Sequence, residues 1–88
     1  MSTVTWQAEI AFDEDEDQTR ARLTLHLPEG GELTARGYAI RNPADQPQAR
    51  IGEEIAAARA FSDLTHQLVD KAAGDISAVT HRPAAIVV

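Results

Sequence analysis

The feature that most constrains the fold is a run with helical periodicity from Arg50 to about Ala73, RIGEEIAAARAFSDLTHQLVDKAA. At about 100° per residue, the apolar side chains of this run fall on one side. They are Ile51, Ile55, Ala58, Phe61, Leu64, Leu68, Val69 and Ala72. The polar residues Arg59, Asp63, His66, Gln67 and Asp70 fall on the other side, which we expect to face water. An alanine-rich centre adds intrinsic helix propensity, so the run is predicted to form one long amphipathic helix.

The apolar side of this helix is wider than a single core requires. It covers roughly half the circumference, whereas a surface helix needs a stripe of about 100°. We therefore expect something besides a sheet to contact it. Two interpretations of the carboxyl end stay open: the helix continues through Gly74 with Ile76 and Val79 in phase, or it breaks there and a short helix restarts over 75–81.

The residues before the helix alternate between apolar and polar, which is the period of a strand that is buried on one face. Three strands are predicted, over about 3–12, 19–27 and 32–41. Pro28, Gly30 and Gly31 supply turn chemistry between the second and third strands, and Asn42, Pro43, Asp45 and Pro47 end the third. On the core face of the third strand, Ala35, Gly37 and Ala39 are small enough to let a helix backbone approach closely.

These elements predict an α+β fold in two layers, a three-stranded antiparallel β-meander followed by one long helix on one face, in the order β-β-β-α. We expect residues 1–88 to form a single domain with an apolar tail over 83–88. A globule of this length has a radius of gyration of about 12 Å.

Charge and composition narrow the classes of function. The net charge of −6 disfavours binding to nucleic acid and to membrane surfaces, which depends on clustered lysine and arginine. Cysteine is absent, no signal-peptide pattern opens the chain, and no apolar run approaches 18 residues. We therefore expect a cytoplasmic protein without a membrane segment, disulfide or cofactor.

Two apolar surfaces have no predicted covering. Tyr38 and Ile40 lie on the sheet face away from the helix, and Ile86, Val87 and Val88 form the apolar tail. Together with the wide helix stripe, these candidate interaction surfaces predict self-association, most simply as a homodimer.

Arg20, Arg22 and Arg36 are predicted to share the uncovered sheet face. They form a weak basic patch that could receive an acidic ligand or an acidic segment of a partner. The alternative is that Glu9 and nearby carboxylates neutralise it, since surface ion pairs are common and individually weak.

The acidic run 13–17 has part of the pattern of a metal-binding loop. Asp13, Asp15 and Asp17 have the spacing of the first three ligands of a calcium loop, but Gln18 stands where that loop needs glycine and Thr24 where it needs a bidentate glutamate. The acidic run is therefore predicted to be a solvated hairpin tip.

The candidate side chains for catalysis in this sequence are three histidines and one serine. His26, His66 and His81 have no metal-ligand spacing. Ser62 lies four residues before His66, but a helix interior leaves no free backbone N–H groups to form an oxyanion hole. We expect no catalytic residue, no bound metal and no enzymatic activity. A small-ligand protein or enzyme using His66 or His26 is the remaining alternative.

Several motifs together resemble a known family. A first strand containing Trp6, the segment GYAIRNP at 37–43, IGEEIAAARAFSDLTHQL at 51–68 and DISAVTHRP at 75–83 are similar to a family of small actinobacterial domains of unknown function. The resemblance implies a fold like that of double-stranded-RNA-binding domains and carries no catalytic residue.

The fold resemblance also suggests RNA binding, which can be tested against the residues. Double-stranded-RNA-binding domains contact phosphates between two minor grooves. Here there is no room for their amino-terminal helix, and Arg50, Glu53 and Glu54 stand at the helix start where a lysine cluster would face phosphate. We therefore predict a non-enzymatic, self-associating interaction module, with nucleic-acid binding as the disfavoured alternative.

Overall fold

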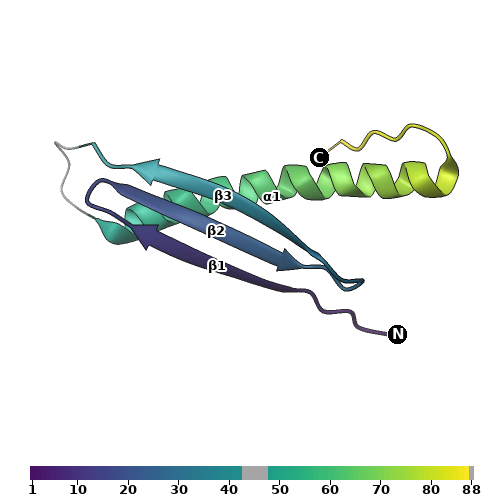
Figure 1. The fold of residues 1–88 in the computed structure, drawn as a ribbon, viewed down its shortest axis with the longest axis horizontal. Helices are drawn as coiled ribbons and strands as arrows, with labels where there is room; N and C mark the ends of the chain where they lie inside the picture. Colours follow the sequence, from purple (N-terminus) through teal and green to yellow (C-terminus); the bar gives the residue numbers. More distant parts are fainter. Residues whose placement is uncertain (43–47, 88) are drawn as a thin grey trace.

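The computed structural model describes residues 1–42 and 48–87. Three strands, β1 (Gln7–Glu14), β2 (Gln18–His26) and β3 (Glu32–Ile40), form an antiparallel sheet in the order β1-β2-β3. One helix, α1 (Ala49–Thr80), crosses one face of this sheet (Figure 1). The predicted α+β meander with one long helix is therefore confirmed.

The strand boundaries differ somewhat from those predicted. β1 begins at Gln7 instead of near residue 3, so Trp6 precedes the sheet, and it continues through Glu14. Glu14 pairs with Thr19 in the ladder, which leaves Asp15 to Asp17 as the exposed turn. The predicted turn residues Pro43, Asp45 and Pro47 lie outside the described residues. Gly30 and Gly31 have φ values of 102° and 82°, and Leu27 N donates to Gly31 O across the β2–β3 turn at 3.0 Å.

The helix runs without a break through Gly74, so the continuous interpretation holds. It ends at His81, which adopts the left-handed conformation at φ 59° and donates its backbone N–H to Ser77 O at 2.8 Å. The helix is longer than the sheet, and Figure 1 shows its last turns projecting beyond the strands. The radius of gyration is 16.7 Å and the longest dimension is 54 Å, so the prediction of about 12 Å was wrong because it assumed a sphere.

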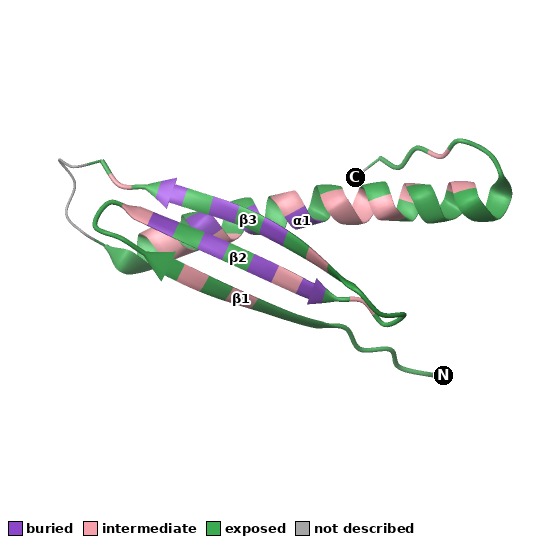
Figure 2. Ribbon diagram, in the orientation of Figure 1, coloured by how far each residue is buried: buried purple, intermediate pink, exposed green. Residues whose placement is uncertain are grey.

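The core lies between α1 and the inner faces of β2 and β3, as the buried segments in Figure 2 show. Its buried apolar members are Ala21, Leu23, Leu25, Ala35, Ala39, Ala56, Ala60 and Leu64. Most of these residues are small, so the helix and the sheet lie close together. β1 contributes only the half-buried Ile10 and Phe12, because the helix passes over the other two strands.

Gly37 is the point of closest approach. A Cβ atom added there would collide with the backbone oxygen of Ala56 and the backbone nitrogen of Ala60, and would lie 2.8 Å from the Cβ of Arg59. This confirms that small residues on β3 admit the helix backbone. It also explains why alanines, and not the bulky residues of the wide apolar side, occupy the sheet-facing positions of α1.

Polar side chains of α1 bond to the outer edge of β3. Arg59 Nη1 donates to Tyr38 O at 2.7 Å, the Arg36 N–H donates to Asp63 Oδ2 at 3.1 Å, and Gln67 Nε2 donates to Thr34 O at 2.9 Å. Arg59 is exposed as expected, whereas Asp63 and Gln67, which were also expected to face water, are partly buried against the edge of the sheet. An edge strand carries backbone groups without a strand partner, and side chains one turn apart on the flank of the helix reach them.

Candidate functional site

The most conspicuous surface of the molecule is the outer side of α1, turned away from the sheet. It carries large apolar side chains that remain exposed. Ile51 is 53% exposed, Ile55 41%, Phe61 51%, Ile76 44% and Val79 80%. These side chains gather towards the two ends of the helix, and solvated apolar side chains on one side of a helix are typical of a binding surface.

The sequence placed these residues on the core side, and that assignment was wrong for most of them. Of the predicted apolar side, only Leu64 is buried, and Leu68 and Val69 are partly buried. Ala56 and Ala60 hold the buried positions. From the sequence they were counted only as part of the alanine-rich centre that favours a helix. The excess width of the apolar arc was nevertheless a correct signal, because the arc extends well beyond the part that the sheet covers.

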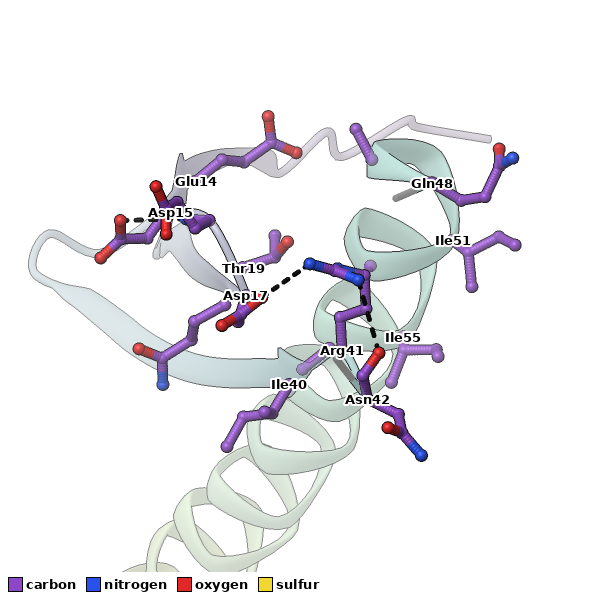
Figure 3. Close-up of a pocket in the computed structure, with 15 residues that line it drawn as sticks. Glu14, Asp15, Asp17, Thr19, Ile40, Arg41, Asn42, Gln48, Ile51 and Ile55 are labelled. Carbon is purple, nitrogen blue, oxygen red and sulfur yellow. Dashed lines mark hydrogen bonds and ion pairs between the residues drawn. The ribbon is translucent and has the colours of Figure 1, made fainter. Parts of the chain in front are cut away.

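A cavity of about 450 Å³ lies at the amino-terminal end of this helix face, between the β1–β2 turn and α1 (Figure 3). Its wall is apolar where Ile40, Ile51 and Ile55 line it. Its rim is acidic, with Glu14, Asp15, Glu16 and Asp17 at the hairpin tip. The cavity therefore suits a segment that combines apolar and basic side chains.

Arg41 joins the end of β3 to the β1–β2 turn at the rim of the cavity. Its guanidinium donates from Nη2 to Asp17 Oδ1 at 2.8 Å, and its backbone N–H donates to Asp17 O at 2.7 Å (Figure 3). One of the four rim carboxylates is thus paired, and the rim keeps a net negative charge.

The predicted apolar surfaces on the sheet and tail are also exposed. Tyr38 is 55% and Ile40 67% exposed on the sheet face opposite the helix, and in the tail Ile86 is 36% and Val87 99% exposed. Val88 lies outside the described residues. Ile40 also lines the cavity, so it belongs to the same end of the molecule as Ile51 and Ile55.

The predicted arginine patch is assembled on the open sheet face. Arg22 stands directly opposite Arg36, and Arg20 opposite Tyr38. Among the described residues none of the three arginines has an ion-pair partner. The expected neutralisation by Glu9 does not occur, because Glu9 Oε1 instead lies 3.2 Å from His26 Nε2.

The histidines and acidic residues considered for chemistry are separated. His26 lies between Glu9 and Glu32 on the open sheet face, and His66 Nδ1 donates to Ser62 O at 2.8 Å within the helix. Across residues 1–42 and 48–87, no three histidines, aspartates or glutamates are arranged to hold a metal ion. Within the same ranges, α1 is not apolar enough to cross a membrane.

A second, smaller hollow lies at the opposite end of the sheet. Trp6, Leu27, Leu68 and Lys71 are among the residues that line it. Lys71 Nζ lies 3.4 Å from Glu29 Oε1 and 2.8 Å from Asp75 Oδ2, which ties the β2–β3 turn to the helix. The hydrogen bond that Lys71 donates to Asp75 raises the pKa of Lys71 above its ordinary value.

Comparison with known proteins agrees with this fold. A family model described as Rv2632c-like matches residues 4–85. The chain belongs to the Rv2632c-like family. The resemblance to a small actinobacterial domain family, made from the motifs, is thereby confirmed.

Two mycobacterial proteins are similar to this chain over most of its length. The uncharacterized protein Rv2632c of Mycobacterium tuberculosis strain H37Rv is 42% identical over 79 residues, covering 90% of this chain and 84% of its own length. The uncharacterized protein Mb1767 of Mycobacterium bovis is 44% identical over 79 residues, with 90% and 83% covered. These relatives assign no activity to the family.

The Rv2632c-like fold is also found by experiment. The crystal structure of Rv2632c matches this chain with a TM-score of 0.85 at 40% identity, covering 94% of this chain and 98% of the other. The β-β-β-α arrangement is therefore shared with a solved member of the family.

Proposed function

We propose that this Rv2632c-like chain is a non-enzymatic protein-interaction module that associates with itself in the cytoplasm. The observation that carries the proposal is the outer side of α1, where Ile51, Ile55, Ile76 and Val79 are 41–80% exposed. A monomer would leave this apolar row in water, whereas association would bury it.

The placement of the titratable groups supports the non-enzymatic part of the proposal. Neither His26 nor His66 lines either of the two hollows described above. A general base needs to reach a bound substrate at hydrogen-bond distance, and His66 already bonds to a carbonyl oxygen of its own helix.

Sedimentation equilibrium tests the proposal directly. We expect the full chain to be dimeric at micromolar concentration and Val79→Asp to be monomeric. Because Val79 lies on the projecting end of the helix, its substitution leaves the core between helix and sheet untouched. Tyr38→Asp on the open sheet face is the matched control and should remain dimeric. A wild-type chain that is monomeric throughout this concentration range would refute the proposal.

A second candidate is nucleic-acid binding by a double-stranded-RNA-binding-domain-like fold. It is favoured by Arg20, Arg22 and Arg36, which share one sheet face without carboxylate partners in the described part of the chain. The net charge of −6 opposes it. The expected result, if this candidate is right, is salt-sensitive retardation of labelled RNA that Arg22→Ala weakens. No retardation at low salt would eliminate it.

A further inference from the structure

The outer side of α1 has a regular spacing that its sheet-facing side lacks. Nine residues follow one another at alternating steps of four and three: Ile51, Ile55, Ala58, Ser62, Thr65, Val69, Ala72, Ile76 and Val79. We call this row the outer seam. A 4-3 repeat sustained over four heptads is the pattern by which one helix packs along another. It drifts around a straight helix at about 20° per heptad, which a left-handed supercoil of two helices compensates.

The outer seam lies opposite the residues that contact the sheet. Ala56, Ala60 and Leu64 are buried against β2 and β3, whereas every seam residue is exposed except Val69, which is partly buried. Packing a second helix on the seam would therefore leave the sheet and core of each copy unchanged.

The centre of the seam carries two hydroxyl groups, of Ser62 and Thr65, and that of Thr65 already has a partner within the helix. Thr65 Oγ1 donates a hydrogen bond to Phe61 O at 2.9 Å within the helix. Its hydroxyl group therefore keeps a partner when water is removed, which avoids the cost of an unsatisfied buried donor.

The distribution of large and small residues is nearly the same in both directions along the seam. Ile51 and Ile55 stand at one end, Ile76 and Val79 at the other, and Ala58 and Ala72 lie at equal distances from Thr65. A two-fold interface has to be complementary to itself. An antiparallel pair of helices meets this requirement when its axis passes near Thr65.

The cavity beside the hairpin tip favours the antiparallel direction. Ile51 and Ile55 belong both to the seam and to the cavity wall, so the cavity opens onto the amino-terminal end of the seam. In an antiparallel pair this end meets the partner's last turn, where Val79 is followed by Arg82. The apolar side chain matches the isoleucine wall, and the cation matches the acidic rim formed by residues 14–17. A parallel pair would instead bring the two acidic tips to the same end.

We propose that two copies of this chain pair through antiparallel α1 helices, with the last helical turn of each copy seated at the cavity of the other. This inference rests on the proposed self-association and names its surface. The seam runs from Ile51 to Val79, a separation of 28 residues or about 42 Å along the helix. With a contact strip about 12 Å wide, each copy buries about 500 Å². The total of about 1,000 Å² is at the lower bound for a biological interface, which is the size of a weak or transient dimer.

The absence of cysteine gives a direct test of this geometry. Ile51→Cys and Val79→Cys variants of the full chain are prepared separately, then mixed at a concentration where sedimentation shows dimers and treated with a short bismaleimide. We expect the mixture to give about tenfold more cross-linked dimer than either variant alone. Asp70→Cys, exposed outside the seam, is the control for random collision and should cross-link no better than the single variants.

Each other outcome overturns a definite part of the inference. If Ile51→Cys and Val79→Cys each cross-link to themselves as efficiently as in the mixture, the helices are parallel and the proposed direction is wrong. If dimers sediment but no mixture cross-links above the control, another surface holds the copies together. In that case the proposal of self-association still holds, and the proposal of helix pairing is wrong. If wild-type and variant chains are monomeric, both proposals fail.

The charge match is tested by Arg82→Glu. We expect this reversal to weaken dimerisation about tenfold at low salt and less at high salt, because exposed ion pairs are screened. Arg22→Glu makes the same change of charge on the open sheet face and should leave the dimer constant within twofold. Equal weakening by both reversals would indicate a general effect of net charge and would overturn the seating of Arg82 at the acidic rim.

Discussion

Gly37→Ala tests how closely helix and sheet are packed. The added methyl group would meet the backbone of Ala56 and Ala60, which cannot rotate away as a flexible side chain can. The third neighbour, the Cβ of Arg59, is at 2.8 Å, whereas carbon atoms prefer a separation of about 3.5 Å or more. The helix must therefore move away from β3 by at least ~0.7 Å.

The expected magnitude follows from three contributions. Overpacking a core costs about 1–3 kcal/mol, and the backbone contacts place this substitution at the upper end. Loosening the bonds from Arg59 to Tyr38 O and from Arg36 N–H to Asp63 adds about 1 kcal/mol. Replacing glycine within a strand recovers about 0.5–1 kcal/mol. The net loss is about 3 kcal/mol from a total of about 5–15 kcal/mol.

Urea unfolding followed by circular dichroism, at one fixed protein concentration, measures this loss. Gly74→Ala is the matched control, because a Cβ atom there meets nothing within 4 Å. The control should stabilise the protein by about 1 kcal/mol through helix propensity. If Gly37→Ala changed the unfolding free energy by less than about 0.5 kcal/mol, the close approach of α1 to β3 would be refuted.

Three further predictions concern other contacts of the helix. Gly52→Ala should destabilise the fold by about 1–2 kcal/mol, because the added Cβ atom would lie 2.7 Å from Thr19 Oγ1. A double-mutant cycle should show that most of this cost vanishes when Thr19 is also replaced by alanine. Asp63→Ala should cost about 1–2 kcal/mol in urea unfolding by removing the acceptor of an edge-strand N–H group, whereas Asp70→Ala, exposed on the same helix, should change stability by less than about 0.5 kcal/mol. The pKa of Lys71 is raised in the folded state, so its charge contributes to the free energy of unfolding in full at neutral pH. This contribution is lost as the pH rises through the folded-state pKa. The difference in unfolding free energy between wild type and Lys71→Met should therefore shrink over that alkaline range.

The arrangement of the fold was largely predictable from sequence. Period-two alternation in the strands, the glycines at 30 and 31, and the long helical run specified a meander with one helix. The small residues at 35, 37 and 39 predicted a close helix approach. These signals are local, or depend on one face of one element, and for that reason they can be read from a single chain.

The side of the helix that meets the sheet was not predictable in the same way. Hydrophobicity alone ranks Ile51, Ile55 and Phe61 above Ala56 and Ala60 as core residues. Once Gly37 has brought the helix backbone against β3, only small side chains fit at the helix positions beside it, which are Ala56 and Ala60. The position of each apolar residue therefore depended on a distance between elements, which no periodicity contains.

The cavity and the polar contacts at the edge of β3 were likewise outside the reach of sequence patterns. They join residues that are far apart in the chain, such as Asp17 with Arg41 and Thr34 with Gln67. The sequence signalled only that the helix had more apolar surface than one sheet could cover.

The bonds from α1 to the outer backbone of β3 also limit how this sheet can grow. Polar groups of β3 that another strand would use are already bound by Arg59, Asp63 and Gln67. Within residues 1–42 and 48–87, β1 is the other edge strand of the sheet, and no strand pairs with its outer side. Two sheets that met edge to edge through β1 would form a wider sheet in which helix side chains occupy backbone groups of both outer strands, and this opposes the addition of further strands. The helix thus protects the chain against the unlimited strand stacking that produces fibrils.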